Sequence, residues 1–368
     1  MKTSFSSALA VVMLGAVTTS AHAGQVRTDG QDMIISTKGG LKIETEDKSA
    51  GFQVGGRLHW DYSLDESNTA ANGARQVEDF DARRARIAFR GYFNDFEYKA
   101  EFNIAESGSG GSAEDLYVKY TGFGDMANVT VGKQRVPLGL EVLTSSNDIS
   151  MLERSAMTER YTLSRSAGLK LSGVGLDQRF TYGVGLFEAD GNGTNDFQER
   201  ALAGRVTFAP VMSTGRLLHF GAGYQNVGAV DPLRETDTMN FEVAAVYGPV
   251  HVQAEYFDSE VGVQNIDGYY AQAGYVFGGG TRPYRDGVFK GVKAAPGGTW
   301  EVVARYESGD GQFSDIGLGA NDAEQMSLGM NYYLNDSVRL GVSYMDGESN
   351  TSADNGDELR MRLQFTWR

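Results

Sequence analysis

The chain contains no cysteine, only six prolines and only four histidines among its 368 residues. Without cysteine it can form no disulfide framework, no thiolate metal site and no thiol nucleophile. The scarcity of proline beside 48 glycines favours turns and closely packed strands over a disordered chain. A mean hydropathy of −0.34 excludes a protein built from membrane-spanning helices.

Basic residues are also in deficit, because 33 Lys and Arg face 48 Asp and Glu, for a formal net charge of −15. Nucleic acid is therefore not an expected partner, since it requires a basic face. Lys2, the apolar run Ala8–Val17 and the triplet Ala21-His22-Ala23 predict that residues 1–23 are a cleaved signal peptide for export. The apolar run is shorter than the ~20 residues that a spanning helix needs.

Three histidines follow the predicted signal peptide, namely His59, His219 and His251. None lies in a nucleophile motif, and Gly-x-Ser-x-Gly is absent from the sequence. We therefore predict no catalytic residue, no metal site and no cofactor. His59 and His251 fall on lumen faces, and we expect each to line the pore and not to act as a catalytic base. A barrel enzyme is the main rival class, and an adhesin or phage receptor is a third.

The last ten residues, Leu359 to Arg368, alternate strictly between apolar and polar side chains. A strand places successive side chains on opposite faces, so this one has an apolar face and a basic face. The terminal aromatic pair Phe365 and Trp367 is typical of a strand that ends at a membrane interface. The pattern predicts that the apolar face contacts lipid and the arginine face contacts a water-filled interior.

The same alternation recurs along residues 51–368, where long acidic connections such as Asp65–Glu78 alternate with short turns. This asymmetry and a tally of about sixteen strands predict an all-β fold, a transmembrane antiparallel β-barrel in the Gram-negative outer membrane. Residues 24–50 are predicted to form an N-terminal periplasmic segment. Outer-membrane lipid and lipopolysaccharide are the expected surroundings. The segment Gly278–Gly298 breaks the short-turn rule without an explanation in the sequence.

The segment Lys133–Arg165 is the longest stretch without strand alternation, and it is amphiphilic where the other long loops are polar. Its apolar side chains need a surface to pack on, so we predict an inward-folded third loop that constricts the channel. The expected constriction residues are Lys133, Arg135, Thr144, Ser145 and Ser146, together with Arg154. An external loop that packs at a subunit contact is the alternative.

Strand alternation assigns more basic than acidic side chains to the interior. The basic set is Arg57, Arg84, Arg86, Arg90, Lys99, Lys119, Lys170, Arg179, Arg205, Arg305, Arg339, Arg360 and Arg362. The opposing acids are Asp61, Glu97, Glu101, Glu242, Glu255, Glu301 and Glu307. Charges in a narrow interior outweigh loop charges, which bulk electrolyte screens over ~8–10 Å.

Several short motifs carry a family resemblance and occur in the same order along the chain. They are Gly55-Gly56-Arg57-Leu58, Arg83-Arg84-Ala85, Tyr120-Thr121-Gly122-Phe123, Gly139-Leu140-Glu141, Thr144-Ser145-Ser146, Leu152-Glu153-Arg154 and Met361-Arg362-Leu363-Gln364. With them the chain resembles the phosphate-selective porin O/P family. The resemblance implies a sixteen-stranded trimeric porin with an inward-folded third loop and a ladder of Arg and Lys that conducts anions. It assigns Arg57, Arg83, Arg84 and Arg154 to the ladder or the constriction.

At some positions the chain departs from the pattern of the phosphate-specific members of the family that it resembles. Val142 or Leu143 and Glu97 stand where those members carry Lys, and Val227–Asp237 holds only one arginine. We therefore predict passive diffusion of small anions, phosphate-like or organic, with low to moderate specificity. The predicted selectivity residues are Arg57, Arg83, Arg84, Arg86, Arg90, Arg154, Arg360 and Arg362. A general or cation-preferring porin is the alternative.

Overall fold

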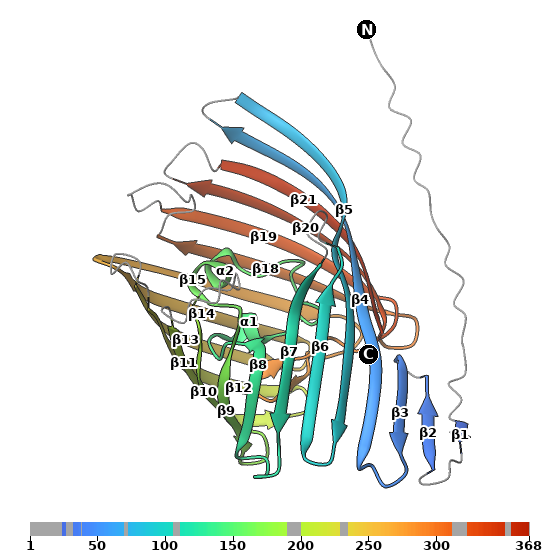
Figure 1. Ribbon diagram of the computed structural model, residues 1–368. Helices are drawn as coiled ribbons and strands as arrows, with labels where there is room; N and C mark the ends of the chain where they lie inside the picture. Colours follow the sequence, from blue (N-terminus) through green and yellow to red (C-terminus); the bar gives the residue numbers. More distant parts are fainter. Residues whose placement is uncertain are drawn as a thin grey trace.

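The computed structural model describes residues 24–26, 32–37, 39–69, 73–105, 111–189, 200–228, 235–310, 322–349 and 355–367. The predicted signal peptide and Arg368 lie outside these residues. Within them, sixteen antiparallel strands close into one barrel, because the last strand pairs with the first strand of the wall (Figure 1). The predicted all-β barrel is confirmed. No helix of the described ranges is both long and apolar enough to cross a membrane.

The barrel strands follow one another around the wall in chain order. They are β4 (Ala50–Thr69), β5 (Gly73–Phe93), β6 (Phe96–Asn103), β7 (Ser112–Tyr120), β8 (Asn128–Arg135), β9 (Arg165–Gly175), β10 (Phe180–Glu188), β11 (Arg200–Ser213), β12 (Arg216–Val227), β13 (Thr236–Tyr247), β14 (Val250–Val261), β15 (Gln264–Val276), β18 (Thr299–Gly309), β19 (Ala323–Tyr333), β20 (Val338–Ser349) and β21 (Asn355–Trp367).

The terminal strand β21 has the two predicted faces. Met361, Leu363 and Phe365 are 46%, 46% and 43% exposed on the outer surface, whereas Arg362 and Gln364 between them are buried. Alternation along a strand produces this difference, since neighbouring side chains point to opposite sides of the wall. The outer face therefore suits lipid and the inner face is polar, as an outer-membrane barrel requires.

The first two barrel strands are longer than the sequence pattern predicts. Residues 65–78 were expected to form a loop, but β4 continues to Thr69 and β5 begins at Gly73. Side chains link the extended hairpin, since the Tyr62 hydroxyl donates to Glu78 at 2.8 Å and the Gln76 amide donates to Glu66 at 2.9 Å. The loop prediction was wrong because polar side chains on both faces resemble a loop in sequence, although two paired strands beyond the apolar band carry them equally well.

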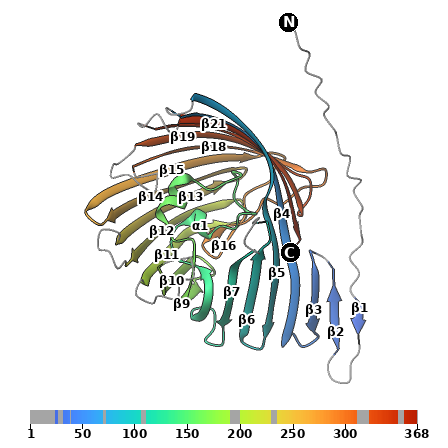
Figure 2. The ribbon, with the colours of Figure 1, turned by 45° about the horizontal axis from the view of Figure 1, so that its top comes forward.

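The N-terminal residues add three short strands to the barrel wall, β1 (Gly24–Val26), β2 (Met33–Ser36) and β3 (Leu41–Thr45) (Figure 2). β3 pairs with β4 at Gly51–Val54, just beyond Gly56, where the pairing of β4 with β21 ends. The N-terminal segment therefore continues the wall where the C-terminal strand stops. Its predicted position in the periplasm stays a prediction.

Two connections are much longer than the rest and leave from opposite ends of the barrel. Loop 136–164 joins β8 to β9 and contains the helices α1 (Leu140–Leu143) and α2 (Ala156–Tyr161). Segment 277–298 joins β15 to β18 and contains a small hairpin of β16 (Tyr284–Arg285) and β17 (Val288–Phe289). An odd number of barrel strands, β9 to β15, lies between the two connections along the chain. Because successive antiparallel strands run in opposite directions, the two connections leave opposite ends of the barrel.

The two long connections meet in an apolar cluster on the inner surface of the wall. Leu140 of α1 and Phe289 of β17 are both fully buried there. The cluster is completed by wall residues of β11, β12 and β13, namely Ala209, Leu217, Ala244 and Val246. A second link is polar, since Arg282 donates to the backbone oxygen of Asp148 at 3.2 Å. Segment 277–298, which the sequence left unexplained, thus packs against the barrel wall and loop 136–164.

Candidate functional site

Seven of the eight predicted selectivity arginines lie on β4, β5 and β21, whereas Arg154 lies in loop 136–164, and most of the eight form ion pairs. Arg57 contacts Glu101 at 3.1 Å and donates to the hydroxyl of Ser146 at 2.9 Å. Arg86 pairs with Glu114, and with Glu101 at 3.5 Å. These carboxylates offset part of the positive charge that strand alternation assigns to the interior.

The densest ion-pair cluster surrounds Glu153 of loop 136–164. Arg84 binds both carboxylate oxygens of Glu153, at 2.8 and 2.7 Å. Arg362 reaches the same carboxylate at 2.5 Å, Arg83 at 3.3 Å and Arg360 at 3.4 Å. Four of the predicted selectivity arginines thus converge on one residue that the sequence did not single out by its own chemistry.

A second cluster lies on β6, β7 and β9, which face the interior beside β5. Lys99 contacts Asp115 at 2.5 Å and Glu101 at 3.1 Å. Arg165 contacts Asp115 at 2.8 Å and Glu114 at 3.1 Å. The sequence did not predict Arg165, Glu114 or Asp115 as interior residues, because they lie at strand ends beside loops, where alternation is hard to read.

Other cations of this region have no acidic partner within the described part of the chain. The Nε atom of Arg90 and the Nη1 atom of Arg135 are buried without a hydrogen-bond partner. Lys170 donates to the backbone oxygen of Arg135 at 3.3 Å rather than to a carboxylate. Arg135 and Lys133 belong to β8, so they are wall residues and not loop residues as predicted. An unpaired guanidinium group keeps the capacity to bind an external anion.

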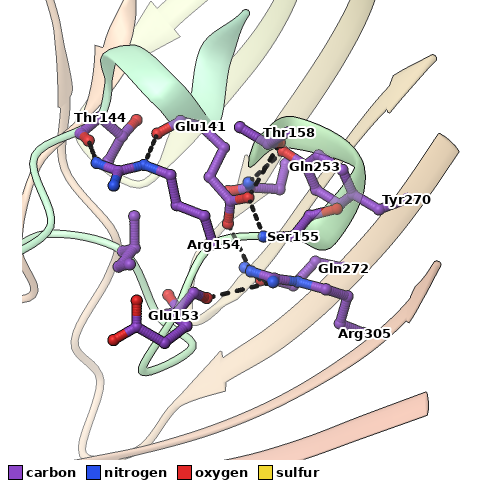
Figure 3. A network of polar contacts seen from close by, with 12 residues as sticks. Glu141, Thr144, Glu153, Arg154, Ser155, Thr158, Gln253, Tyr270, Gln272 and Arg305 are labelled. Carbon is purple, nitrogen blue, oxygen red and sulfur yellow. Dashed lines mark hydrogen bonds and ion pairs between the residues drawn. The ribbon is translucent and has the colours of Figure 1, made fainter. Parts of the chain in front are cut away.

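Loop 136–164 uses its predicted constriction residues mainly to hold its own shape (Figure 3). Arg154 donates to the backbone oxygens of Glu141 and Thr144, at 3.1 and 2.8 Å. The Thr144 hydroxyl donates to the backbone oxygen of Leu140 at 2.8 Å, and the Ser146 hydroxyl accepts a hydrogen bond from Arg57. Thr144 and Ser146 are buried, which differs from the expectation that they are offered to solutes.

The Ser145 hydroxyl accepts a hydrogen bond from the backbone N–H of Asn147 at 3.3 Å. Burial lowers the pKa of Arg154, whose nearest carboxylate is that of Glu159 at 3.7 Å. Ser145 and Arg154 therefore both take part in the internal hydrogen bonding of the loop. Short polar side chains of this kind commonly bond to nearby backbone in turns, so the Thr-Ser-Ser run is better explained as loop architecture than as a row of solute ligands.

Glu141 is a buried acid of loop 136–164 and links α1 to the barrel wall. Its carboxylate accepts from Arg305 at 2.5 Å and from the backbone N–H of Ser155 at 2.8 Å (Figure 3). In turn the carboxylate of Glu255 accepts from the backbone N–H groups of Leu140 and Glu141, at 2.5 and 3.0 Å. Sequence alternation predicts interior positions for Arg305 and Glu255, but it cannot predict their partners.

The three histidines are buried and contact the two long connections, which corrects the prediction that His59 and His251 line the pore. His59, His219 and His251 have no exposed surface. His59 contacts the Asn147 side chain at 2.9 Å, and His219 contacts the Tyr284 hydroxyl at 2.6 Å. His251 lies 2.9 Å from the Glu301 carboxylate, close to Arg282 of segment 277–298.

Segment 277–298 is held by backbone and side-chain contacts with the barrel wall. Arg282 donates to Gln253 at 2.8 Å and lies 4.0 Å above the ring of Phe289. Arg205 donates to the backbone oxygen of Gly287 at 2.8 Å. Burial lowers the pKa of Arg282, and the Glu301 carboxylate opposes that shift. The segment therefore occupies the interior beside β11 to β18 as a packed element.

Interior space remains on the other side of the barrel. A cavity of about 410 Å³ lies against β4 to β7, and its lining includes Gln53, Arg90, Lys99 and Tyr117. Lys42 of β3 also borders it, so the N-terminal strands contribute a cation to this space. Among these lining cations Arg90 has no ion pair within the described ranges, whereas Lys99 and Lys42 are paired with carboxylates. Water-accessible space beside a cation of this kind is what a channel for small charged solutes needs.

A closed sixteen-stranded barrel with an apolar outer face and a charged, water-accessible inner face defines an outer-membrane porin. The sequence profile of the family described as phosphate-selective porin O and P matches residues 52–238 and 226–367. The chain belongs to this family.

The chain is similar to one known protein in sequence and to two solved structures in fold. Porin O of Pseudomonas aeruginosa is 28% identical over 429 aligned positions, which cover 96% of both proteins. The anion-selective porin from Comamonas acidovorans aligns over 86% of this chain and 99% of its own, with a TM-score of 0.56 and 13% identity. OmpT of Vibrio cholerae, in its trimer form, covers 87% of this chain and 100% of its own, with a TM-score of 0.57 and 14% identity. At these identities the two solved structures show a shared fold.

Proposed function

We propose that this porin is a passive, anion-preferring channel of low to moderate specificity, for phosphate-like or small organic anions. The observation that carries the proposal is the charge balance on the inner faces of β5 to β9. Beyond the arginines that bind Glu153, seven cations lie on the described part of these faces that starts at Arg86 of β5, namely Arg86, Arg90, Lys99, Lys119, Arg135, Arg165 and Lys170, against four carboxylates, Glu97, Glu101, Glu114 and Asp115. An excess of cations in a narrow water-filled space raises the local concentration of anions.

Limited specificity follows from the neutral and acidic side chains of this chain at the positions where phosphate-specific porins of the family carry Lys. Val142 is buried in α1, and Glu97 pairs with Lys119 at 3.0 Å. Neither position adds a free cation to the interior. Ion pairs with fixed carboxylates also weaken the hold of each arginine on a passing anion, which helps release, and conduction requires sites that the ion can leave.

The proposal includes an inward-folded loop 136–164 that narrows the channel. Its support comes from contacts with inner-face residues on widely separated strands. Arg339 of β20 donates to the backbone oxygens of Ile149 and Ser150, at 2.7 and 2.6 Å, and Gln364 of β21 donates to that of Asn147 at 3.2 Å. An external loop at a subunit contact would not reach these side chains.

A trimer in the outer membrane, in contact with lipid and lipopolysaccharide, is the proposed assembly, and the trimeric relative supports it. We also propose that residues 24–50 lie on the periplasmic side, because β3 joins the wall at the end where the short turns lie. Catalysis has no place in this proposal, since the buried histidines and carboxylates bind structural partners. The mass of the purified detergent complex tests the trimer.

The reversal potential of single channels in a potassium chloride gradient tests the proposed selectivity. We expect a value displaced toward the chloride equilibrium potential. A value displaced toward potassium would favour the alternative of a general or cation-preferring porin. Liposome swelling with small sugars separates a channel from a barrel that acts mainly as an adhesin or phage receptor, because such a barrel would admit none.

A further inference from the structure

Glu153 is bound in the way that proteins bind a free oxyanion. Its two carboxylate oxygens receive guanidinium groups from two strands, β5 with Arg83 and Arg84, and β21 with Arg360 and Arg362. Arg84 binds both oxygens in the bidentate manner that matches carboxylate and phosphate geometry. We call these four residues the arginine quartet.

The charges around the quartet are nearly balanced only because Glu153 is present. Asp61 binds Arg362 through two contacts, at 2.6 and 2.5 Å, and Glu358 pairs with Arg360. Four guanidinium charges therefore face three carboxylates. Among these three carboxylates, Glu153 comes from loop 136–164, whereas Asp61 and Glu358 come from the barrel wall, so the strand pairing does not fix the position of Glu153.

Two further observations distinguish Glu153 from a buried structural acid. Its side chain keeps 18% of its surface exposed, whereas the side chain of Glu141, the other anchoring acid of the loop, keeps 1%. Moreover, the surrounding backbone is held independently of the carboxylate. Arg305 donates to the backbone oxygen of Glu153 at 3.3 Å, and Arg362 donates to that of Leu152. The carboxylate can therefore move while the loop stays anchored.

We propose that the arginine quartet is an oxyanion-binding site and that Glu153 is its tethered resident ligand, which a phosphate-like anion or a carboxylate must displace. This inference rests on the proposed anion-conducting function and assigns it a specificity-determining residue. A tethered competitor acts at an effective concentration on the order of millimolar or higher, so it lowers the apparent affinity of the site for a free anion. The site then passes oxyanions without trapping them.

The test is the block of chloride current by inorganic phosphate, measured with the full-length porin in planar bilayers. Glu153→Gln removes the competing charge and keeps the shape of the side chain. We expect the phosphate concentration at half-block to fall by about tenfold or more. The reason is that a hydrogen bond to a charged group is worth about 1.5–3 kcal/mol, and each 1.4 kcal/mol is tenfold in affinity. Glu46→Gln is the control, since Glu46 is an exposed acid in the turn between β3 and β4, away from the quartet; its half-block should equal that of the wild type.

An unchanged half-blocking phosphate concentration in correctly assembled Glu153→Gln would overturn the proposal. If that variant fails to assemble, Glu153→Asp decides the matter, since it keeps the charge and shortens its reach. We expect a smaller shift of the same sign for Glu153→Asp, and no shift would overturn the proposal. A failure of the proposed function is separate, because it would appear as a cation-preferring reversal potential of the wild type.

Discussion

On the inner faces of β12 and β14, His219 and His251 have no exposed surface, whereas Lys99 and Lys119 on β6 and β7 keep 20% and 29% of their side chains exposed. The first region, the inner faces of β11 to β20, is covered by loop 136–164 and segment 277–298, and we call it the filled side. The second region is the inner faces of β5 to β9, of which β5, β6 and β7 border the remaining cavity, and we call it the open side. Both arise from the same strand alternation, so polarity of the inner face alone does not identify the conducting surface.

Burial changes what a charge does on each side. On the filled side the Glu301 carboxylate accepts hydrogen bonds from four side chains, those of Ser150, His251, Asn331 and Tyr333, at 2.7 to 2.9 Å. A buried charge requires such partners, so these groups are committed to structure. On the open side, water and solutes can replace part of the protein contacts. The predictions below break or sharpen this distinction.

The largest effect is expected from loss of a filled-side acid. Glu301→Ala leaves four buried hydrogen-bonding side chains without their acceptor, so it should destabilise the barrel by about 3–5 kcal/mol. The temperature at which the folded, faster-migrating gel form disappears measures the change. Glu97→Ala is the open-side control, since Glu97 is half-exposed and pairs only with Lys119, and it should leave that temperature nearly unchanged. Equal losses in both variants would contradict the distinction between the two sides.

Replacing the side chains of the central part of segment 277–298, on the filled side, should widen the channel. Replacing residues 283–290 with an equally long Gly/Ser stretch takes away the Tyr284 contact with His219 and the packing of Phe289 on Leu140. We expect a higher single-channel conductance with an anion preference that persists. Unchanged conductance in a barrel that folds would mean that this segment does not border the conducting path.

On the open side, charge reversal should change selectivity and not stability. Arg90→Glu combined with Lys170→Glu converts two cations that lack acidic partners, so the reversal potential should move toward that of potassium. The control is Arg179→Glu, because Arg179, which strand alternation assigned to the interior, instead lies in an exposed turn before β10 and donates to the backbone oxygen of Pro210. An equal shift in the control would show that charge anywhere on the barrel sets the selectivity.

The sequence predicts features that depend on neighbours along the chain. Alternation determines the number of barrel strands, the inward arginines of β5 and β21, and the amphiphilic character of loop 136–164. It cannot predict contacts between distant residues, such as Glu153 with Arg362, 209 positions apart. Segment 277–298 was unexplained for the same reason, since its buried side chain Phe289 packs on Leu140, which comes from the opposite end of the barrel.

The smallest expected effect concerns pH and isolates Glu153 from the other acids. Burial alone would raise the pKa of Glu153, but Arg84, Arg362 and Arg83 outweigh burial and hold the pKa well below its ordinary value of 4.5. An acid with a lowered pKa in the folded state contributes stability above its unfolded pKa and loses it only as the pH falls through the folded pKa. Glu153 thus keeps its charge throughout the range from pH 7 to about 5, since an unperturbed Glu titrates near 4.3.

The difference in reversal potential between the wild type and Glu153→Gln should therefore stay constant from pH 7 to about pH 5, although each value can drift as exposed loop acids titrate. Taking the difference removes those acids, because both proteins carry them. A difference that shrinks toward zero within this range would mean that Glu153 gains a proton there. Burial, and not the guanidinium groups of the quartet, would then control the protonation of the carboxylate, which would contradict its assignment as the charged resident ligand of the site.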